Sequence, residues 1–406
     1  MRILHTSDWH LGQHFMGKSR QAEHQAFMAW LIEQVRAQGV DALIIAGDVF
    51  DTGAPPSYAR ELYNGFIVAL RETGAELVVL GGNHDSVAML GESRTLLAHL
   101  NTRVIPGVCE ALDDQVLVLR HLDGSPGAVL CAIPFIRPRD VLHSQAGQSA
   151  QDKQASLQAA IHGHYQALHG LAEARREELG GRLPIIATGH LTTVGASASE
   201  SVREIYVGAL EAFPTSAFPP AAYIALGHIH KPQKVGGLEH IRYCGSPIPL
   251  SFDEAKQQKE VLLVELDECG LVGITPLPVP RFQPLLALSG SLAELQLAIA
   301  DAARQGTPQC PAWLEIQVSG DDYLSDLQPR IAALCEGLPV EVLRIRRARG
   351  TATTSLQAAA RETLDELSAE QVFAQRLAGE TLDAALQDRL QGLYRQVLGE
   401  LREPPL

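Results

Sequence analysis

Five short polar clusters carry the residues of this sequence that could do metal chemistry. Each cluster follows a short apolar run typical of a buried strand, in most cases with a glycine between the two. The clusters are Asp8-Trp9-His10, Gly47-Asp48-Val49-Phe50-Asp51, Gly82-Asn83-His84-Asp85, Gly189-His190 and Gly227-His228-Ile229-His230. Because ligands of α/β proteins gather at the carboxyl ends of strands, this order predicts that the five clusters meet at one rim.

The residue types in these clusters are those that bind borderline divalent metals such as manganese, zinc or iron. Asp8 and His10, like His228 and His230, are spaced i, i+2, which puts both side chains on one face of an extended segment. The candidate ligands outnumber those that one ion needs: Asp8, His10, Asp48, Asn83, His190, His228 and His230. Two ions with one bridging carboxylate are the known arrangement for in-line displacement at phosphate.

Taken singly, each pair is a weak signal. A D-x-H or G-H pair arises by chance and commonly marks a loop or a hydrogen-bonded histidine. Five of the fifteen histidines fall in the clusters, and we interpret the others as ordinary. The repeated order of strand and then ligand is what favours a metal centre.

The elements that must position the clusters follow an α/β pattern. Apolar runs predict strands, and helical periodicity predicts helices between them. The expected strands span 3–6, 42–46, 77–80, 116–119, 128–133, 183–188, 222–226 and 261–266, and the expected helices span 21–38, 58–72 and most of 144–182.

Beyond this region the composition changes. Four prolines at 276, 278, 280 and 284 predict a linker. A small α+β pattern follows, with helices over 292–305 and 324–334 and strands over 313–318 and 340–345. Residues 351–406 have helical periodicity, with an apolar stripe from Leu382 to Leu401. We therefore expect three parts: a metal-binding domain over 1–275, a capping domain over 276–350, and C-terminal helices over 351–406 that dock on a partner.

Composition and charge exclude several classes of protein. The chain has 406 residues, of which 46% are hydrophobic and 20% charged, so it is not a disordered chain. The net charge of −14, from 33 basic and 47 acidic residues, argues against a generally basic nucleic-acid-binding surface. A phosphate-bearing substrate must then be held by a local feature, such as a bound divalent metal.

Targeting and redox features are few. Six cysteines form no CxxC pair, no apolar run reaches about 18 residues, and the first residues contain no apolar secretion signal. These features predict a reduced cytoplasmic protein that does not span a membrane.

The five clusters, in this order, resemble the calcineurin-like metallophosphoesterase superfamily. Its pattern is D-x-H, G-D-x-x-D, G-N-H-D, G-H and G-H-x-H. A closer resemblance is to the SbcD family, the nuclease subunits of bacterial SbcC–SbcD complexes. It is carried by HTSDWHLG at 5–12, GHIHKP at 227–232 and YCGSPIPLSFDE at 243–254. The likeness covers about residues 1–270, and beyond them only the architecture fits.

This resemblance implies a four-layer α/β/β/α sandwich with a small α+β capping domain and C-terminal helices. It implies two divalent metal ions, manganese in the productive form, that make hydroxide available near neutral pH and neutralise phosphoryl charge. One ion would be held by Asp8, His10, Asp48 and His230. The other would be held by Asp48, Asn83, His190 and His228, with Asp48 as the bridge.

By the same resemblance, His84 lies near the scissile phosphate and is not a main metal ligand. It would stabilise the transition state or protonate the leaving oxygen. We expect Asp51 to orient His84 and to raise its basicity. The alternative is that Asp51 only caps the following turn.

The implied activity is a manganese-dependent DNA phosphodiesterase: a 3′-to-5′ exonuclease on duplex ends and an endonuclease on single strands and hairpins. It would act in DNA repair, recombination and replication with an SbcC-type ATPase that has coiled-coil arms, as a homodimer within a heterotetramer. Two alternatives stay open. One is a phosphoesterase acting on a small molecule or phosphoprotein, which would need neither cap nor C-terminal helices. The other is a non-catalytic scaffold, against which the complete ligand set argues.

Two further features have competing interpretations. Residues 12–19 match the P-loop expression G-x-x-x-x-G-K-[ST], but the strand before them already delivers Asp8 and His10, so we predict no nucleotide site. Lys18 and Arg20 would contact the DNA backbone or belong to a solvated loop. The arginines at 344, 346, 347 and 349 would contact phosphate or lie on a solvated edge strand.

Overall fold

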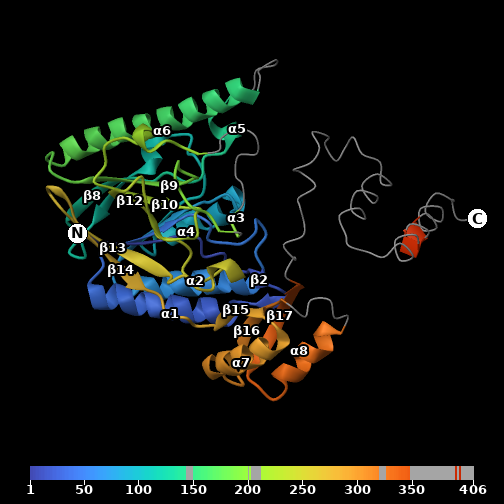
Figure 1. Cartoon of the computed structure of the whole chain (residues 1–406). Helices are drawn as coiled ribbons and strands as arrows, with labels where there is room; N and C mark the ends of the chain where they lie inside the picture. The colour runs from blue at the N-terminus through green and yellow to red at the C-terminus, as the bar shows by residue number, and fades with distance from the viewer. Residues whose placement is uncertain are drawn as a thin grey trace, which may run out of the picture.

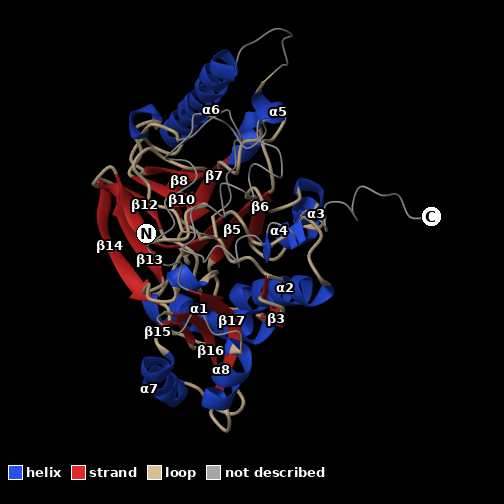
Figure 2. Cartoon of the chain, turned by 45° about the vertical axis from the view of Figure 1, so that its right-hand side comes forward, coloured by secondary structure: helices blue, strands red, loops and turns tan. Residues whose placement is uncertain are grey.

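Two six-stranded mixed sheets packed face to face form the centre of the structure (Figures 1 and 2). The computed structural model describes residues 1–142, 150–199, 201–202, 212–319 and 326–347, together with 389–390 and 393–394. The first sheet has the order β14-β13-β1-β4-β5-β6. Its strands are β1 (Arg2–Thr6), β4 (Ala42–Ala46), β5 (Glu76–Leu80), β6 (Thr102–Ile105), β13 (Glu260–Asp267) and β14 (Gly270–Pro278). The four strands from β1 to β6 are parallel, and β13 and β14 add an antiparallel edge.

The second sheet has the order β11-β12-β10-β9-β8-β7. Its strands are β7 (Val116–Arg120), β8 (Pro126–Cys131), β9 (Ile185–His190), β10 (Tyr223–Gly227), β11 (Gln233–Val235) and β12 (Leu238–Tyr243). Its four central strands are parallel and both of its edge strands are antiparallel to their neighbours. The carboxyl ends of the neighbouring strands β9 and β10 therefore lie at the same end of this sheet.

Helices cover the outer face of each sheet (Figure 1). The first sheet packs on α1 (Gln21–Gln38), α2 (Ser57–Arg71), α3 (Val87–Gly91) and α4 (Arg94–Ala98), and the second packs on α5 (Pro138–Val141) and α6 (Ala150–Glu178). Between the sheets lies a separate core in which Ile44 and Val78 of one sheet meet Leu130 and Ile186 of the other. The predicted four-layer α/β/β/α sandwich is confirmed.

A smaller parallel sheet with its own core follows in the chain. It is built from β15 (Leu285–Gly290), α7 (Leu292–Ala302), β16 (Ala312–Val318), α8 (Leu327–Cys335) and β17 (Val340–Arg347). Ser291 and Glu294 form a capping box that starts α7. Leu295 and Ile299 of this helix pack on Leu314 and Ile316 of β16. The predicted helix-strand-helix-strand order is present, and β15 precedes it.

The connection between the two parts is shorter than the prolines suggested. Pro276 and Pro278 lie in β14, at the edge of the first sheet, where a residue without an N–H is tolerated. The predicted boundary at 275/276 therefore falls inside β14, and the connection to β15 runs over 279–284.

The small sheet contacts the sandwich through an aromatic cluster. Phe15 stacks on Trp313 with ring centroids 5.9 Å apart, and it also contacts Phe252, 5.1 Å away. Lys18 forms an ion pair with Glu341 beside this cluster. Residues of the P-loop-like segment and of β16 and β17 thus hold the two parts together.

The P-loop-like segment is a hairpin. Its strands are β2 (His14–Phe15) and β3 (Lys18–Ser19), and the turn residues Met16 and Gly17 both have positive φ, 49° and 81°. That is the pattern of a type I′ turn, whereas a P-loop wraps a helix start, so this segment does not have P-loop geometry. Arg20 is buried against Glu23, and the interpretation of Arg20 as a DNA contact is wrong because its charge is already paired.

One prediction falls almost wholly outside this description. The C-terminal helices predicted over 351–406 lie outside the described residues, except that 389–390 and 393–394 are helical. Among the described helices, none combines the length and apolar character needed to cross a bilayer.

Candidate metal centre

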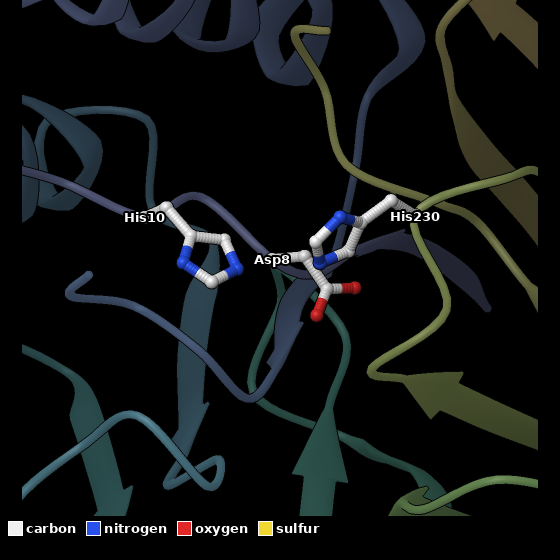
Figure 3. Close-up of side chains that lie close together, drawn as sticks. All are labelled: Asp8, His10 and His230. Carbon is white, nitrogen blue, oxygen red and sulfur yellow. The ribbon is translucent and has the colours of Figure 1, made fainter. Parts of the chain in front are cut away.

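The five polar clusters meet where the carboxyl ends of strands from both sheets converge. Asp8 and His10 follow β1, Asp48 follows β4, and His84 follows β5. His190 ends β9, and the last cluster, from His228 to His230, follows β10. Three groups of ligand atoms lie within 4.8 Å of one another: Asp8–His10–His230, His10–Asp48–His84 and Asp48–His190–His228. Figure 3 shows the first group, with His10 and His230 directed toward Asp8 from opposite sides.

The predicted residues do converge, but the geometric reason for that prediction is wrong: the i, i+2 spacing assumed extended segments. Asp8, His10, Asp48 and His228 have positive φ, between 48° and 95°, so none of these segments is extended at its ligands. A left-handed residue other than glycine costs on the order of 1 kcal/mol or more and persists only where its surroundings enforce it. The chain turns back at each strand end and aims the side chain inward, which an i, i+2 argument cannot foresee.

The centre has two halves, the Asp8–His10–His230 group and the His190–His228 pair, and Asp48 lies between them. Its Oδ2 is 3.2 Å from His190 Nε2 and 3.7 Å from His10 Nε2, while its Oδ1 accepts a hydrogen bond from the His84 N–H at 2.9 Å. Asn83 Oδ1 is 2.9 Å from the same nitrogen of His190. This is the position that a bridging carboxylate requires, and the assignment of the seven ligands to two ions remains a prediction.

Three of the histidines use Nδ1 for a supporting contact. His10 Nδ1 lies 3.1 Å from Asp51 Oδ1, His190 Nδ1 lies 2.9 Å from the Ala46 carbonyl oxygen, and His230 Nδ1 lies 2.6 Å from Ser201 Oγ. An acceptor on Nδ1 keeps its proton there and leaves Nε2 as the metal-binding atom.

Two buried nitrogens support the same assignment. Within the described residues, His10 Nε2 and His228 Nε2 are buried and have no hydrogen-bond partner. A buried polar atom left without a partner is costly, and a metal ion supplies one. The residues of this centre therefore fit a pair of borderline divalent ions.

The electrostatics of the centre favour positive charge. Burial would lower the pKa of His190, but the neighbouring Asp48 and Asp8 outweigh it and raise the pKa to about 9. Burial would likewise raise the pKa of Asp48, but His190 and His10 hold it well below its usual range. Burial and then the His190 charge lower the pKa of His228. The field that stabilises a protonated His190 is the field that would attract a metal cation.

Asp51 contacts two histidines of the centre, His84 and His10, with different groups. The hydrogen bond to His84 Nδ1, at 2.8 Å, goes to the backbone carbonyl of Asp51, while the Asp51 carboxylate lies against His10. Asp51 thus orients His84 with a group that any residue at this position would offer. Its side chain instead orients a predicted metal ligand.

Glycine before a cluster is required by close approach. A Cβ on Gly227 would lie 1.9 Å from the Ala46 carbonyl oxygen, and one on Gly82 would lie 2.1 Å from Asp48 Oδ1. Asp85 holds the same loops: its carboxylate accepts hydrogen bonds from the N–H groups of Val49, Phe50 and Gly82. Burial and the nearby Asp48 raise the pKa of Asp85 to about 6.

Sequence reasoning missed a buried network behind His230. Glu254 and Lys259 form an ion pair of 2.6 Å, and Glu254 also accepts a hydrogen bond from Ser201. Burial would raise the pKa of Glu254, but His230 and Lys259 hold it well below its usual range. The available signal was that Glu254 ends the 243–254 stretch that carries the closer family resemblance.

Comparisons with known proteins agree with this geometry. Residues 1–232 match the family described as Calcineurin-like phosphoesterase, and residues 281–381 match the Type 5 capsule protein repressor C-terminal domain. The chain is 55% identical to the SbcD subunit of the nuclease SbcCD from Escherichia coli K12, over 99% of this chain and 98% of the relative. It is 34% identical to the protein of the same name from Rhodobacter capsulatus, over 92% and 94% of the two chains.

Replacement of Asp48 by asparagine tests the bridge. We expect bound metal to fall from two ions toward one or none and cleavage to be abolished. The reason is that the substitution removes the negative charge of the carboxylate proposed to bridge the two ions. Metal content by mass spectrometry beside a cleavage assay measures both effects. Asp41→Asn is the matched control, since Asp41 is buried just before β4 and accepts the Arg2 and Leu122 N–H groups. Retention of both ions and of activity in Asp48→Asn would refute the two-metal assignment.

His84 and Asp51 are expected to fail in different ways. His84→Ala should keep both ions while the single-turnover cleavage rate falls by ~10²–10⁴, the usual worth of a positioned acid or charge stabiliser. Asp51→Asn should weaken metal binding instead, by about 10- to 100-fold, because its carboxylate supports His10. Parallel loss of metal and rate in His84→Ala would make His84 a ligand. Full metal affinity in Asp51→Asn would reject its supporting role.

Proposed function

Because this chain belongs to the calcineurin-like phosphoesterase family and, within it, to the SbcD nucleases, we propose that it is a metal-dependent DNA nuclease working with an SbcC-type ATPase. The observation that carries the activity is the position of Asp48 between two groups of buried ligands. That arrangement suits in-line displacement at a phosphodiester.

The mechanism gives the residues of the centre distinct roles. Two divalent ions bound here would neutralise phosphoryl charge and make hydroxide available near neutral pH. The seven proposed ligands would hold the two ions. The supporting contacts on Nδ1 orient the imidazole rings so that Nε2 faces the site. Asn83 contributes a neutral oxygen beside His190.

We propose that His84 acts on the substrate. Its Nδ1 faces the Asp51 carbonyl, which can only accept a hydrogen bond, so Nδ1 carries a proton in either charge state. In the imidazolium form Nε2 also carries a proton and can donate it to the leaving oxygen or stabilise charge on the phosphate. His84 is half-buried, whereas His10 and His190 are buried, which suits a group that meets substrate.

We propose manganese as the productive metal, duplex ends for 3′-to-5′ exonuclease action, and single strands and hairpins for endonuclease action. The relatives' names support a nuclease in a two-component complex. We further propose a cytoplasmic role in DNA repair, recombination and replication, with a homodimer of this chain inside a heterotetramer.

The proposed nuclease activity depends little on the basic residues near the small sheet. Arg344 is paired with Glu315, Arg346 Nε lies 3.5 Å from the same carboxylate, and Lys18 is paired with Glu341. These pairings favour a structural role over phosphate contact.

A substrate comparison tests the activity. We expect cleavage of hairpin and linear DNA with manganese, slower cleavage with magnesium, and stimulation by the ATPase partner with ATP. Asp48→Asn serves as the inactive control. Equal or faster turnover of bis-p-nitrophenyl phosphate or of a phosphoprotein, with intact DNA, would favour the small-molecule or phosphoprotein alternative. Absence of turnover on all substrates would favour a scaffold.

The division of the chain into a nuclease domain, a capping domain and C-terminal docking helices is also a proposal. Two observations support it: the small sheet has its own core, and Leu393 of the predicted apolar stripe is 51% exposed. A helix with the predicted apolar stripe would dock with that stripe in a groove on a partner.

Truncation after residue 350 tests the docking role, because β17 ends at Arg347 and every described strand is kept. We expect a folded nuclease that cleaves single-stranded DNA but no longer co-purifies with the ATPase. The full-length variant Leu386→Asp/Leu393→Asp should show the same loss, while Gln387→Asp between the stripe residues should not. Co-purification of the truncated chain at the wild-type level would rule out this docking site.

A further inference from the structure

A buried carboxylate lies directly behind the proposed ligand His230. Glu254 is 0% exposed, and its two oxygens have separate sets of partners. Oε1 accepts hydrogen bonds from Ser199 and Ser201, and Oε2 accepts them from Lys259 and the Leu250 N–H, with Ser246 Oγ 3.3 Å away. All the capacity of this carboxylate is used, which fixes its orientation.

Ser201 connects Glu254 to the imidazole. A serine hydroxyl has one hydrogen, and a carboxylate can only accept, so the Ser201 O–H is donated to Glu254. Its oxygen, 2.6 Å from His230 Nδ1, then accepts the Nδ1–H. Glu254 Oε1 itself is 3.4 Å from the same nitrogen. This chain of contacts keeps Nδ1 protonated and leaves Nε2 directed toward Asp8.

Lys259 completes the network from the opposite side. Its ammonium is buried and donates to the backbone carbonyl of His230, to Ser246 and to Glu254. The pair therefore holds His230 at two points: Glu254 acts on the side chain through Ser201, and Lys259 binds the backbone carbonyl. Burying two charges brings no reliable gain in stability over an apolar pair, so the contacts that the pair makes with His230 are what point to its role.

A second buried ion pair provides a contrast. Arg20 and Glu23 are also buried, and Arg20 donates further to Gln13 and to the Pro249 carbonyl. None of these hydrogen bonds reaches a proposed metal ligand. Both are buried pairs of a cation and a carboxylate, and only the Glu254–Lys259 pair contacts a proposed ligand.

We propose that Glu254 is a positioning residue for metal binding, acting through Ser201 on His230, with Lys259 as its counter-charge. This inference rests on the proposed function, because it takes His230 as a ligand. It gives the 243–254 stretch a specific role, which is to support the Asp8–His10–His230 half of the centre.

The principal test is the double variant Glu254→Gln/Lys259→Met, which removes both buried charges and leaves neither unpaired. We expect manganese affinity at one of the two sites to fall by about 10- to 100-fold, the usual effect of removing such a support. Titration calorimetry and metal content measure it. Cleavage should recover as manganese is raised, which a general folding defect would not allow.

Arg20→Met/Glu23→Gln is the matched control and should keep wild-type manganese affinity, even with a lower melting temperature. Ser201→Ala keeps both charges and should also weaken one site, while Ser201→Thr should restore it. Wild-type affinity in a folded Glu254→Gln/Lys259→Met variant overturns the proposal. If that variant does not fold, wild-type affinity in Ser201→Ala overturns it.

The same titrations separate this inference from the proposed function. A wild-type chain that binds fewer than two ions, or leaves DNA intact, contradicts the proposed function itself. A wild-type chain that binds two ions and cleaves DNA, alongside network variants with unchanged affinity, contradicts only the role of Glu254.

Discussion

The burial of two carboxylates, Asp8 and Asp48, where the two sheets meet is the constraint on which the rest of the structure depends. A buried carboxylate is costly unless it is paired and hydrogen-bonded. Backbone N–H groups of His228 and His84 and the rings of His190 and His10 meet part of this need. The remaining demand for positive charge is what makes the site a metal centre, and it must be met with ligands from both sheets.

Much of the local structure follows from delivering those ligands. Four of the proposed ligands have left-handed backbone, which ordinary residues adopt only when packing enforces it. The enforcement is visible around them: Asp85 clamps the loops after β4 and β5, and Gly82 and Gly227 let backbones approach at distances that a Cβ would forbid. Strain at the site is held by contacts just outside it.

The supporting contacts are not equal in the two halves of the centre. His10 and His230 are backed by carboxylates, directly by Asp51 and through Ser201 by Glu254, whereas His190 is backed by a backbone carbonyl. A carboxylate adds negative charge as well as orientation. The half that holds Asp8 therefore depends more on its surrounding side chains. Divalent ions bound at this centre would supply local positive charge in a chain whose net charge is −14.

The sequence by itself determined most of the central elements and the candidate ligands. Apolar runs located the central strands and α1 closely, because buried parallel strands and long amphipathic helices carry strong periodic signals. Among the described strands it missed β2, β3, β6, β11, β12, β14 and β15, where the runs are short, half-exposed or interrupted by proline. The chemistry of Asp, His and Asn pointed to the metal centre wherever those residues came to lie. Only the tertiary structure decided which group of Asp51 faces which histidine, that Glu254 stands behind His230, and that Arg20 is buried. Most of these contacts join segments that are distant in the sequence, or they depend on local backbone turns. Sequence periodicity predicts helices and strands, but it does not predict which distant segments come into contact when the chain packs.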